Sequence, residues 1–295
     1  MSGHLLAWVF LPAAVFWTAV TPVHGKLVVS GPLSVGPRCG YLTVDPVSRH
    51  SSFARRACVR DGVRVVVRDS PWWPVYVGRR LAFRYQDSST GRPVSARFGD
   101  TLWLYDVATD RGPLLQRWSL RTGRLVREIR FPVRLWRPVM TANATGVWLM
   151  AATNGGESDS PSVATLFHAS THVTAVARGA RAAMWMTVHG RTLWIETVAG
   201  LHTFKLWRYD GLRGRLLTRH AEPYLWSTAY GNGALWGAAA RYCGKRVRAL
   251  RIDARTGVSR TIASLPLLDC NFAGAGVYFR GAFWFVDGDK LLRVR

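Results

Sequence analysis

Short apolar segments separated by turn residues run through the second two-thirds of the chain, and none has the spacing of an amphipathic helix. Five of them pass from a glycine-containing turn into an apolar stretch with a tryptophan, namely GDTLWLYD, TGVWLMAA, GRTLWIET, GALWGAAA and GAFWFVDG. Their tryptophans lie 45, 46, 42 and 48 residues apart, at Trp103, Trp148, Trp194, Trp236 and Trp284. A period in the forties made of short strands indicates a repeated all-β unit.

Four strands can be assigned within one such unit: LWSTAYG, ALWGAAA, VRALRID and VSRTIAS. A turn signature precedes the fourth strand, Asp253 to Gly257, in which an Asp side chain can accept bonds from the following backbone and Gly supplies a positive φ. We therefore predict an all-β fold, a β-propeller of four-stranded antiparallel blades. A mature chain of about 270 residues divided by a period of about 45 gives six blades, with seven as the alternative because residues 31–98 are divergent. We expect the five tryptophans to fill the space between blades.

The last unit has only three strands before the chain stops after KLLRVR. An open sheet edge invites aggregation, and a propeller avoids it when a strand from the other end of the chain completes the last blade. We predict that an N-terminal strand does so and assign this strand to KLVVS, residues 26–30.

Residues 5–20 form an apolar run that Pro12 interrupts and that is short for a membrane span. Small side chains at Val23 and Gly25 favour cleavage before Lys26. We therefore expect a signal peptide at 1–25, one propeller domain at 26–295, and an exported protein that is extracellular or in the cell envelope. A signal peptide usually has a positively charged segment before its apolar run, but residues 1–4 contain no Lys or Arg. A retained N-terminal anchor and a misassigned start are therefore the alternatives.

The four cysteines have neither C-x-x-C spacing nor nearby histidine pairs, so we expect no metal site. An even number in an exported chain favours disulfides, and the shortest loops pair Cys39 with Cys58 and Cys243 with Cys270. Free buried thiols are the alternative.

The chain has 40 Lys and Arg against 17 Asp and Glu, a formal net charge of +23. Such a charge attracts polyanions, so the candidate partners are anionic polymers or an anionic membrane surface. No motif for specific nucleic-acid binding is present, and we expect a monomer. An arginine-rich genomic composition is the alternative source of the charge, because the cations are spread over all repeats.

The repeats resemble the broad YVTN, quinoprotein-like and virginiamycin-lyase-like propeller group, in which a G-x-x-L-W strand is followed by a strand ending in D-x-x-T-G. Residues 98–132 and 230–266 carry the resemblance most clearly. In quinone-binding members a Trp follows the T-G turn, whereas here RLVREIR and VSRTIAS follow, so we expect no cofactor. The lyase relatives imply a metal held by His and Glu near the channel, for which His189 and Glu196 are the nearest match here.

A second aromatic series lies 9–12 residues before its marker tryptophans, near the start of the innermost strand of each blade. Aromatic rings and guanidinium groups can both stack on a planar or anionic ligand. The candidate ligand-binding residues at the channel mouth are therefore Trp136, Trp185, Trp226, Arg134, Arg137 and Arg181. The alternative for the tryptophans is packing between innermost strands.

These observations favour a non-catalytic binding module, with a ligand that could be an anionic cell-envelope polymer. The alternative is a propeller lyase or oxidoreductase. Its catalytic residues would lie on the channel rim, where no motif identifies them.

Overall fold

A computed structural model describes most of the chain and contains only strands and turns among these residues. The described residues are 6–10, 19–32, 38–48, 50–57, 59–60, 63–65, 72–86, 93–106, 109–152, 164–180, 183–200, 203–221, 224–241, 244–266, 276–287 and 290–295. Within these ranges no helix is long and apolar enough to span a membrane. The strands form antiparallel four-stranded sheets, as the sequence predicts.

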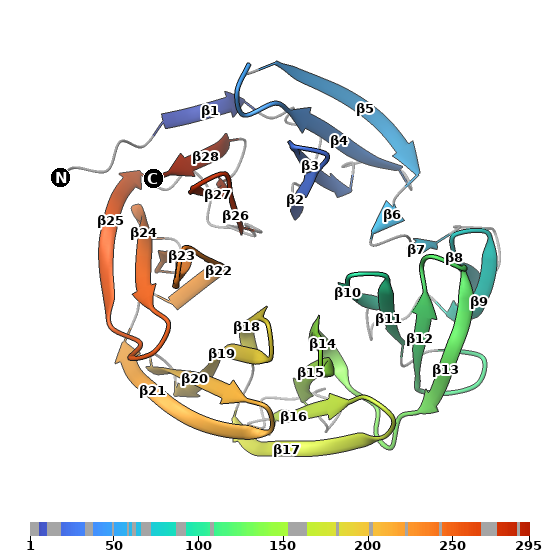
Figure 1. Ribbon diagram of the computed structural model, residues 1–295. Coiled ribbons are helices and arrows are strands. Elements are labelled where there is room, and N and C mark those ends of the chain that lie inside the picture. Colours follow the sequence, from blue (N-terminus) through green and yellow to red (C-terminus); the bar gives the residue numbers. More distant parts are fainter. Residues whose placement is uncertain are drawn as a thin grey trace. The chain divides into compact units, whose positions relative to one another are not determined.

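The contacts divide the chain into two compact units, one made of residues 1–58, 202–206 and 216–295, the other of residues 59–201 and 207–215. The first unit contains three sheets (Figure 1). Their strands are β2 (Ala19–Val23), β3 (Lys26–Pro32), β4 (Arg38–Val44) and β5 (Ser51–Ala57); β22 (Tyr224–Gly231), β23 (Ala234–Ala240), β24 (Arg246–Asp253) and β25 (Ser259–Pro266); and β26 (Gly276–Phe279), β27 (Ala282–Asp287), β28 (Lys290–Val294) and β1 (Leu6–Phe10).

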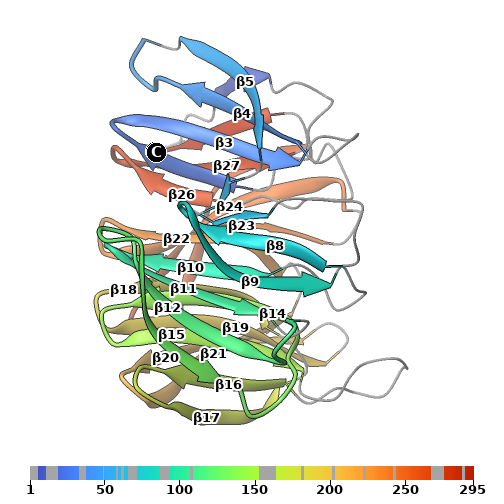
Figure 2. The same cartoon turned by 90° about the vertical axis from the view of Figure 1, so that its right-hand side faces the viewer.

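The second unit contains three complete sheets and the first two strands of a fourth, and β14 to β17 can be followed as one sheet in Figure 2. The complete sheets are β6 (Val59–Arg60), β7 (Val63–Val65), β8 (Trp72–Val77) and β9 (Arg80–Gln86); β10 (Val94–Phe98), β11 (Thr101–Asp106), β12 (Leu114–Ser119) and β13 (Arg124–Arg130); and β14 (Trp136–Asn143), β15 (Gly146–Ala152), β16 (Ala164–Ala169) and β17 (Val173–Ala180). The last sheet starts with β18 (Ala183–His189) and β19 (Thr192–Gly200), and its strands β20 (Thr203–Asp210) and β21 (Arg213–Ala221) are shared between the units.

An N-terminal strand completes the last sheet, as predicted, but its identity differs from the prediction. The sheet order is β1-β28-β27-β26, and Leu6 lies opposite Arg293 while Phe10 lies opposite Lys290 (Figure 1). The predicted donor, residues 26–30, belongs instead to β3, the second strand of its own sheet. The prediction failed because it treated the apolar run before residue 26 as a leader without a place in a sheet.

The described strands form seven four-stranded sheets, the alternative that the divergent residues 31–98 left open, rather than the six that were the first choice. Strand β2 pairs with β3 through the two-residue turn His24–Gly25, in which both residues have positive φ. The equivalent hairpins β22/β23 and β26/β27 use Asn232–Gly233 and Arg280–Gly281 with the same φ signs. This is the type I′ turn whose twist matches that of antiparallel strands. The divergent region supplies the very short strands β6 and β7, which explains its weak repeat pattern.

The five repeat tryptophans are buried, between 0% and 6% exposed, and those in the described core clusters pack between neighbouring sheets as predicted. Trp284 contacts Leu27 and Val44 of the β2–β5 sheet, and Trp236 contacts Phe283 of the last sheet. In the second unit Trp148 packs against Leu193 and Ile195. The five second strands that contain these tryptophans, β11, β15, β19, β23 and β27, are therefore buried on both faces, which requires the apolar side chains that mark them in the sequence.

The turn before the fourth strand also has the predicted chemistry. Asp253 Oδ1 accepts hydrogen bonds from the backbone N–H groups of Thr256 and Arg255 and from the Thr256 hydroxyl, at 2.7 to 2.9 Å. The bonds from Thr256 come first among the interactions that lower the pKa of Asp253 below its ordinary value of 3.8. Gly257 closes the turn with a φ of 78°, a conformation that costs glycine little because it lacks a Cβ atom.

Removal of residues 1–25 tests the role of β1 and β2. The bond between Gly25 and Lys26, where cleavage is expected, follows the turn that joins β2 to β3. The shortened chain therefore keeps β3 but lacks β1 and β2. We expect its free energy of unfolding to fall by at least about 3 kcal/mol, because each lost ladder hydrogen bond contributes about 0.5–1.5 kcal/mol. Urea unfolding of both chains measures this. A chain without residues 1–5 is the control, and equal stability of residues 26–295 and the full chain would contradict the assignment.

Candidate functional site

Those residues predicted to line the channel mouth that the structure describes lie in or just before the first strand of their sheets. Trp136 and Arg137 begin β14, and Trp226 is the third residue of β22, but the structure describes only their backbone. Arg134 is exposed in the segment before β14, and Arg181 lies outside the described residues. The structure therefore does not test whether these side chains converge, and the predicted ligand site stays a prediction.

Trp185 is the one tryptophan of this series whose side chain is described, and it is buried. Its indole Nε1–H donates a hydrogen bond of 2.8 Å to Oε2 of Glu196, which lies directly opposite on β19 and is fully buried. His189 lies at the exposed turn end of the same hairpin, opposite Thr192. Glu196 thus fixes a buried indole in β18, which matches the packing alternative for Trp185.

Only one of the four cysteines lies in the described residues, and this residue, Cys39 of β4, is disulfide-bonded. Cys58, Cys243 and Cys270 lie outside these residues, so neither pairing is tested. Strand β5 ends at Ala57, opposite Arg38, the residue before Cys39.

Exposed arginines gather on the fourth strand of the sheets, a pattern that the sequence analysis missed. The exposed arginine side chains of these strands are Arg55 on β5, Arg80 and Arg84 on β9, Arg124, Arg127 and Arg130 on β13, Arg178 on β17, Arg213, Arg215 and Arg219 on β21, and Arg260 on β25. The same six strands contain a single acidic residue, Glu128. The signal is present in the sequence as segments such as RLVREIR and RGRLLTRHA, but only the strand order shows that all of them occupy the same position in a sheet.

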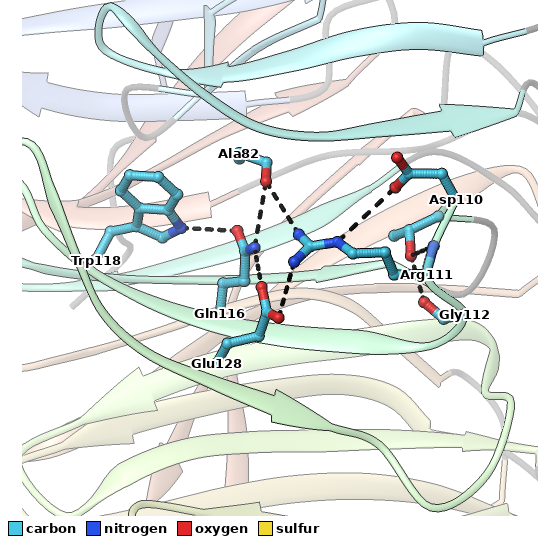
Figure 3. A network of polar contacts seen from close by, with 8 residues as sticks. Ala82, Asp110, Arg111, Gly112, Gln116, Trp118 and Glu128 are labelled. Carbon is cyan, nitrogen blue, oxygen red and sulfur yellow. Dashed lines mark hydrogen bonds and ion pairs between the residues drawn. The ribbon is translucent and has the colours of Figure 1, made fainter.

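A polar network joins the β6–β9 and β10–β13 sheets (Figure 3). The fully buried Gln116 accepts a hydrogen bond of 2.9 Å from Trp118 Nε1–H and donates through Nε2 to Glu128 Oε2 at 2.7 Å. Arg111 forms an ion pair of 2.9 Å with the other Glu128 oxygen. Both Gln116 and Arg111 also donate to the backbone carbonyl of Ala82 in β9, at 3.3 Å.

These contacts make Gln116 and Glu128 structural residues, since the network bonds both side-chain polar groups of Gln116 and both carboxylate oxygens of Glu128. A buried polar group is tolerated when it is hydrogen-bonded and costs stability when it is not. The network therefore fixes β9 against β12. Nothing in the sequence pattern identifies Gln116, because it lies alone in an apolar strand.

Replacement of Gln116 by Leu removes the acceptor of the buried Trp118 Nε1–H and the donor to Glu128 Oε2, while Arg111 still contacts the other Glu128 oxygen. We expect the free energy of unfolding to fall by about 1–3 kcal/mol, the cost of leaving a buried donor, here the Trp118 Nε1–H, without an acceptor, as measured by urea denaturation. Arg130→Gln, on the exposed face of β13, is the control and should change stability by no more than about 0.5 kcal/mol. Equal stability of the two variants would show that the network does not hold the sheets.

His168 on β16 contacts the turn of the neighbouring hairpin. Its ring lies 4.5 Å from that of Trp148, and its Nε2 is 3.2 Å from the hydroxyl of Thr145. Burial is the main cause that lowers the pKa of His168 below its ordinary value of 6.5, and the nearby charge of His172 lowers it further, while a bond to Thr145 acts in the opposite direction. The neutral imidazole is thus favoured in the folded protein.

A lowered pKa in the folded state means that the unfolded chain takes up a proton at higher pH than the folded chain does. We therefore expect stability to fall as the pH drops below 6.5, and His168→Gln to lose this part of the pH dependence. Unfolding curves of both proteins across this range provide the measurement. Their difference at about pH 8, where an ordinary histidine is neutral, gives the packing effect alone, and parallel pH profiles would contradict the prediction.

Comparison with known proteins shows similarity at the level of the fold. No known protein family profile matches the chain, and no curated protein matches it in sequence. Among solved structures, the β-propeller domain of the Trilobed protease from Pyrococcus furiosus, described as having an open velcro topology, has a TM-score of 0.60 at 6% identity, over 95% of this chain and 94% of that one. The uncharacterized protein lmo1340 from Listeria monocytogenes EGD-e has a TM-score of 0.53 at 8% identity, over 96% and 93%. Sqt1 from Saccharomyces cerevisiae has a TM-score of 0.50 at 12% identity, over 100% and 99%.

The chain is therefore a β-propeller, and at these identities the similarity concerns the fold alone. The fold implied by the YVTN and quinoprotein-like resemblance is confirmed, whereas membership of that repeat group is not shown. Propellers serve broadly as binding or scaffold modules, and the specific function depends on the site rather than on the fold. Among the described residues, no group of three or more His, Cys, Asp or Glu side chains is placed to hold a metal ion.

Proposed function

We propose that this chain is a non-catalytic binding module, exported to the cell surface or beyond, that holds an anionic cell-envelope polymer on the arginines of its fourth strands. One observation carries the proposal. Eleven exposed arginines occur on these strands together with one acidic residue, Glu128, whose carboxylate already contacts Arg111 and Gln116.

The sign of this charge supports a partner rather than a purely protective role. Charged side chains on an edge strand, lysine above all, prevent edge-to-edge pairing of sheets. Protection alone would favour lysine, whereas the charged residues of these strands are arginines with the single exception of Glu128. A surface of one sign attracts a partner of the opposite sign, and guanidinium groups bind carboxylate and phosphate oxygens through two parallel hydrogen bonds.

The distribution of the arginines favours a polymer over a small ligand. In the second unit they recur on β9, β13 and β17, the fourth strands of three successive sheets. An exposed ion pair contributes only about 0.2–1 kcal/mol, so useful affinity needs many contacts at once. A chain of repeated anionic groups provides them, whereas a single small anion meets one or two arginines.

Removal of three of these charges should weaken binding to a polyanion such as polygalacturonate. In Arg124→Gln/Arg130→Gln/Arg178→Gln we expect roughly tenfold weaker binding, because three contacts of about 0.5 kcal/mol sum to about the 1.4 kcal/mol of a tenfold change. Binding of the unaltered protein should also weaken steeply between about 0.01 M and about 1 M salt. Calorimetric titration measures both effects.

The matched control removes the same number of charges from hairpin turns, as Arg79→Gln/Arg121→Gln/Arg191→Gln. Equal weakening in the two triple variants would mean that net charge alone, and not the fourth-strand surface, attracts the polymer. Neutral dextran should not bind. Binding that is insensitive to salt would refute the proposal, and binding to anionic lipid vesicles without binding to the polymer would assign a membrane surface as the partner instead.

A further inference from the structure

A pocket of about 260 Å³ opens in the second unit where the turns of two neighbouring sheets meet. The β10/β11 turn contributes Phe98, the β14/β15 turn contributes Asn143 and Thr145, and the β16/β17 turn contributes Ser170. Trp103 from β11 and Arg117 from β12 also line the pocket. Arg117 is the one charged side chain in the described lining, so the electrostatics of the pocket are cationic.

The side-chain amide of Asn143 has a defined orientation. Its Oδ1 accepts a hydrogen bond of 3.0 Å from the backbone N–H of Thr145 and one of 2.6 Å from the Thr145 hydroxyl. Because a backbone N–H can only donate, the oxygen of the amide must lie on this side and the nitrogen on the other. His168 Nε2, at 3.2 Å, then donates to the Thr145 oxygen, whose proton is already used by Asn143. Hydrogen bonds arranged in series polarise one another, so the Asn143 amide becomes a stronger donor.

That donor has no acceptor within the described protein. Asn143 is 4% exposed, and its Nδ2 is shielded from solvent without a hydrogen-bond partner. A buried N–H group without an acceptor is unfavourable, and most native proteins satisfy such groups. An acceptor that enters the pocket would satisfy it after a small adjustment of side chains, which is common when a ligand binds.

Arg117 adds a second donor group in a fixed position. Its guanidinium carbon lies 5.7 Å from the centre of the Trp103 ring, and Trp103 is 2% exposed. Stacking on a buried indole restricts the guanidinium plane, and the planar fork suits an oxyanion better than a lysine ammonium does. The hydroxyl of Ser170 and the partly exposed ring of Phe98 offer further contacts at the edge of the pocket.

We propose that this pocket binds a single oxyanion group, a carboxylate or a phosphate, through the Asn143 amide and the Arg117 guanidinium. Its volume lies just below the roughly 300–1,000 Å³ of pockets for drug-sized ligands, which suits one residue of a polymer. The suggestion that this residue belongs to an anionic envelope polymer rests on the proposed function. Binding of the oxyanion group itself is independent of the proposed function.

Calorimetric titration of the full chain with glucuronate, and separately with inorganic phosphate, tests the pocket and distinguishes the two oxyanions. We expect saturable binding of at least one of them. Asn143→Asp keeps the oxygen that accepts from Thr145 but replaces the amide donor by a negative charge, so we expect at least tenfold weaker binding. Arg117→Lys keeps the charge and loses the fork, and it should weaken binding less. Circular dichroism of each variant confirms that it is folded.

The outcomes separate this inference from the proposed function. Arg124→Gln/Arg130→Gln/Arg178→Gln should bind glucuronate or phosphate normally, although its affinity for the polymer falls. Normal small-anion binding without any polymer binding would refute the proposed function and support the pocket. Absence of saturable binding for both small anions, or unchanged binding by folded Asn143→Asp, would overturn the inference.

Discussion

Coverage of the second strand of each sheet on both faces is the constraint on which the rest of the structure depends. A four-stranded sheet alone cannot bury such a strand on both faces, so neighbouring sheets within each unit cover one another. Trp284 is buried by the β2–β5 sheet, and Trp148 by side chains of β19. Loss of one of these sheets therefore exposes the tryptophan of its neighbour. This mutual dependence accounts for the regular spacing of the tryptophans.

Polar interactions between sheets follow from the same packing. Where apolar side chains fill the space, as around Trp284, hydrogen bonds between sheets are unnecessary. Between β9 and β12, Gln116 and Arg111 instead donate hydrogen bonds to the backbone carbonyl of Ala82. Glu128 accepts from the same two side chains through its carboxylate. The Asn143 turn is built differently, since Thr145 satisfies the oxygen of the amide and leaves the nitrogen without an acceptor. A satisfied network holds sheets together, whereas an unsatisfied donor beside a cationic pocket suits a ligand.

The fourth strands are the exposed edges of these sheets, and their composition decides what the surface can bind. A buried second strand has little freedom in sequence, because its neighbours require large apolar side chains. The exposed face of the fourth strand meets no such requirement, so it can carry arginines without cost to the core. Function is thus free to reside at the edges and turns while the tryptophan strands maintain the fold. The buried hydrogen bond between Trp185 and Glu196 belongs to the interior that maintains the fold.

The sequence by itself determined the local structure: the alternation of strands and turns, the repeat, the Asp253 turn and the buried tryptophans. These depend on contacts over a few residues or on a pattern that recurs. Only the tertiary structure decided that residues 6–10 pair with β28, that β2 and the short strands β6 and β7 raise the number of sheets to seven, and that the arginines share one strand position. Leu6 and Arg293 are partners from opposite ends of the chain, and Asn143, Arg117 and Ser170 meet from separate turns and strands. Such pairings are fixed by how sheets pack in three dimensions, which no local pattern records.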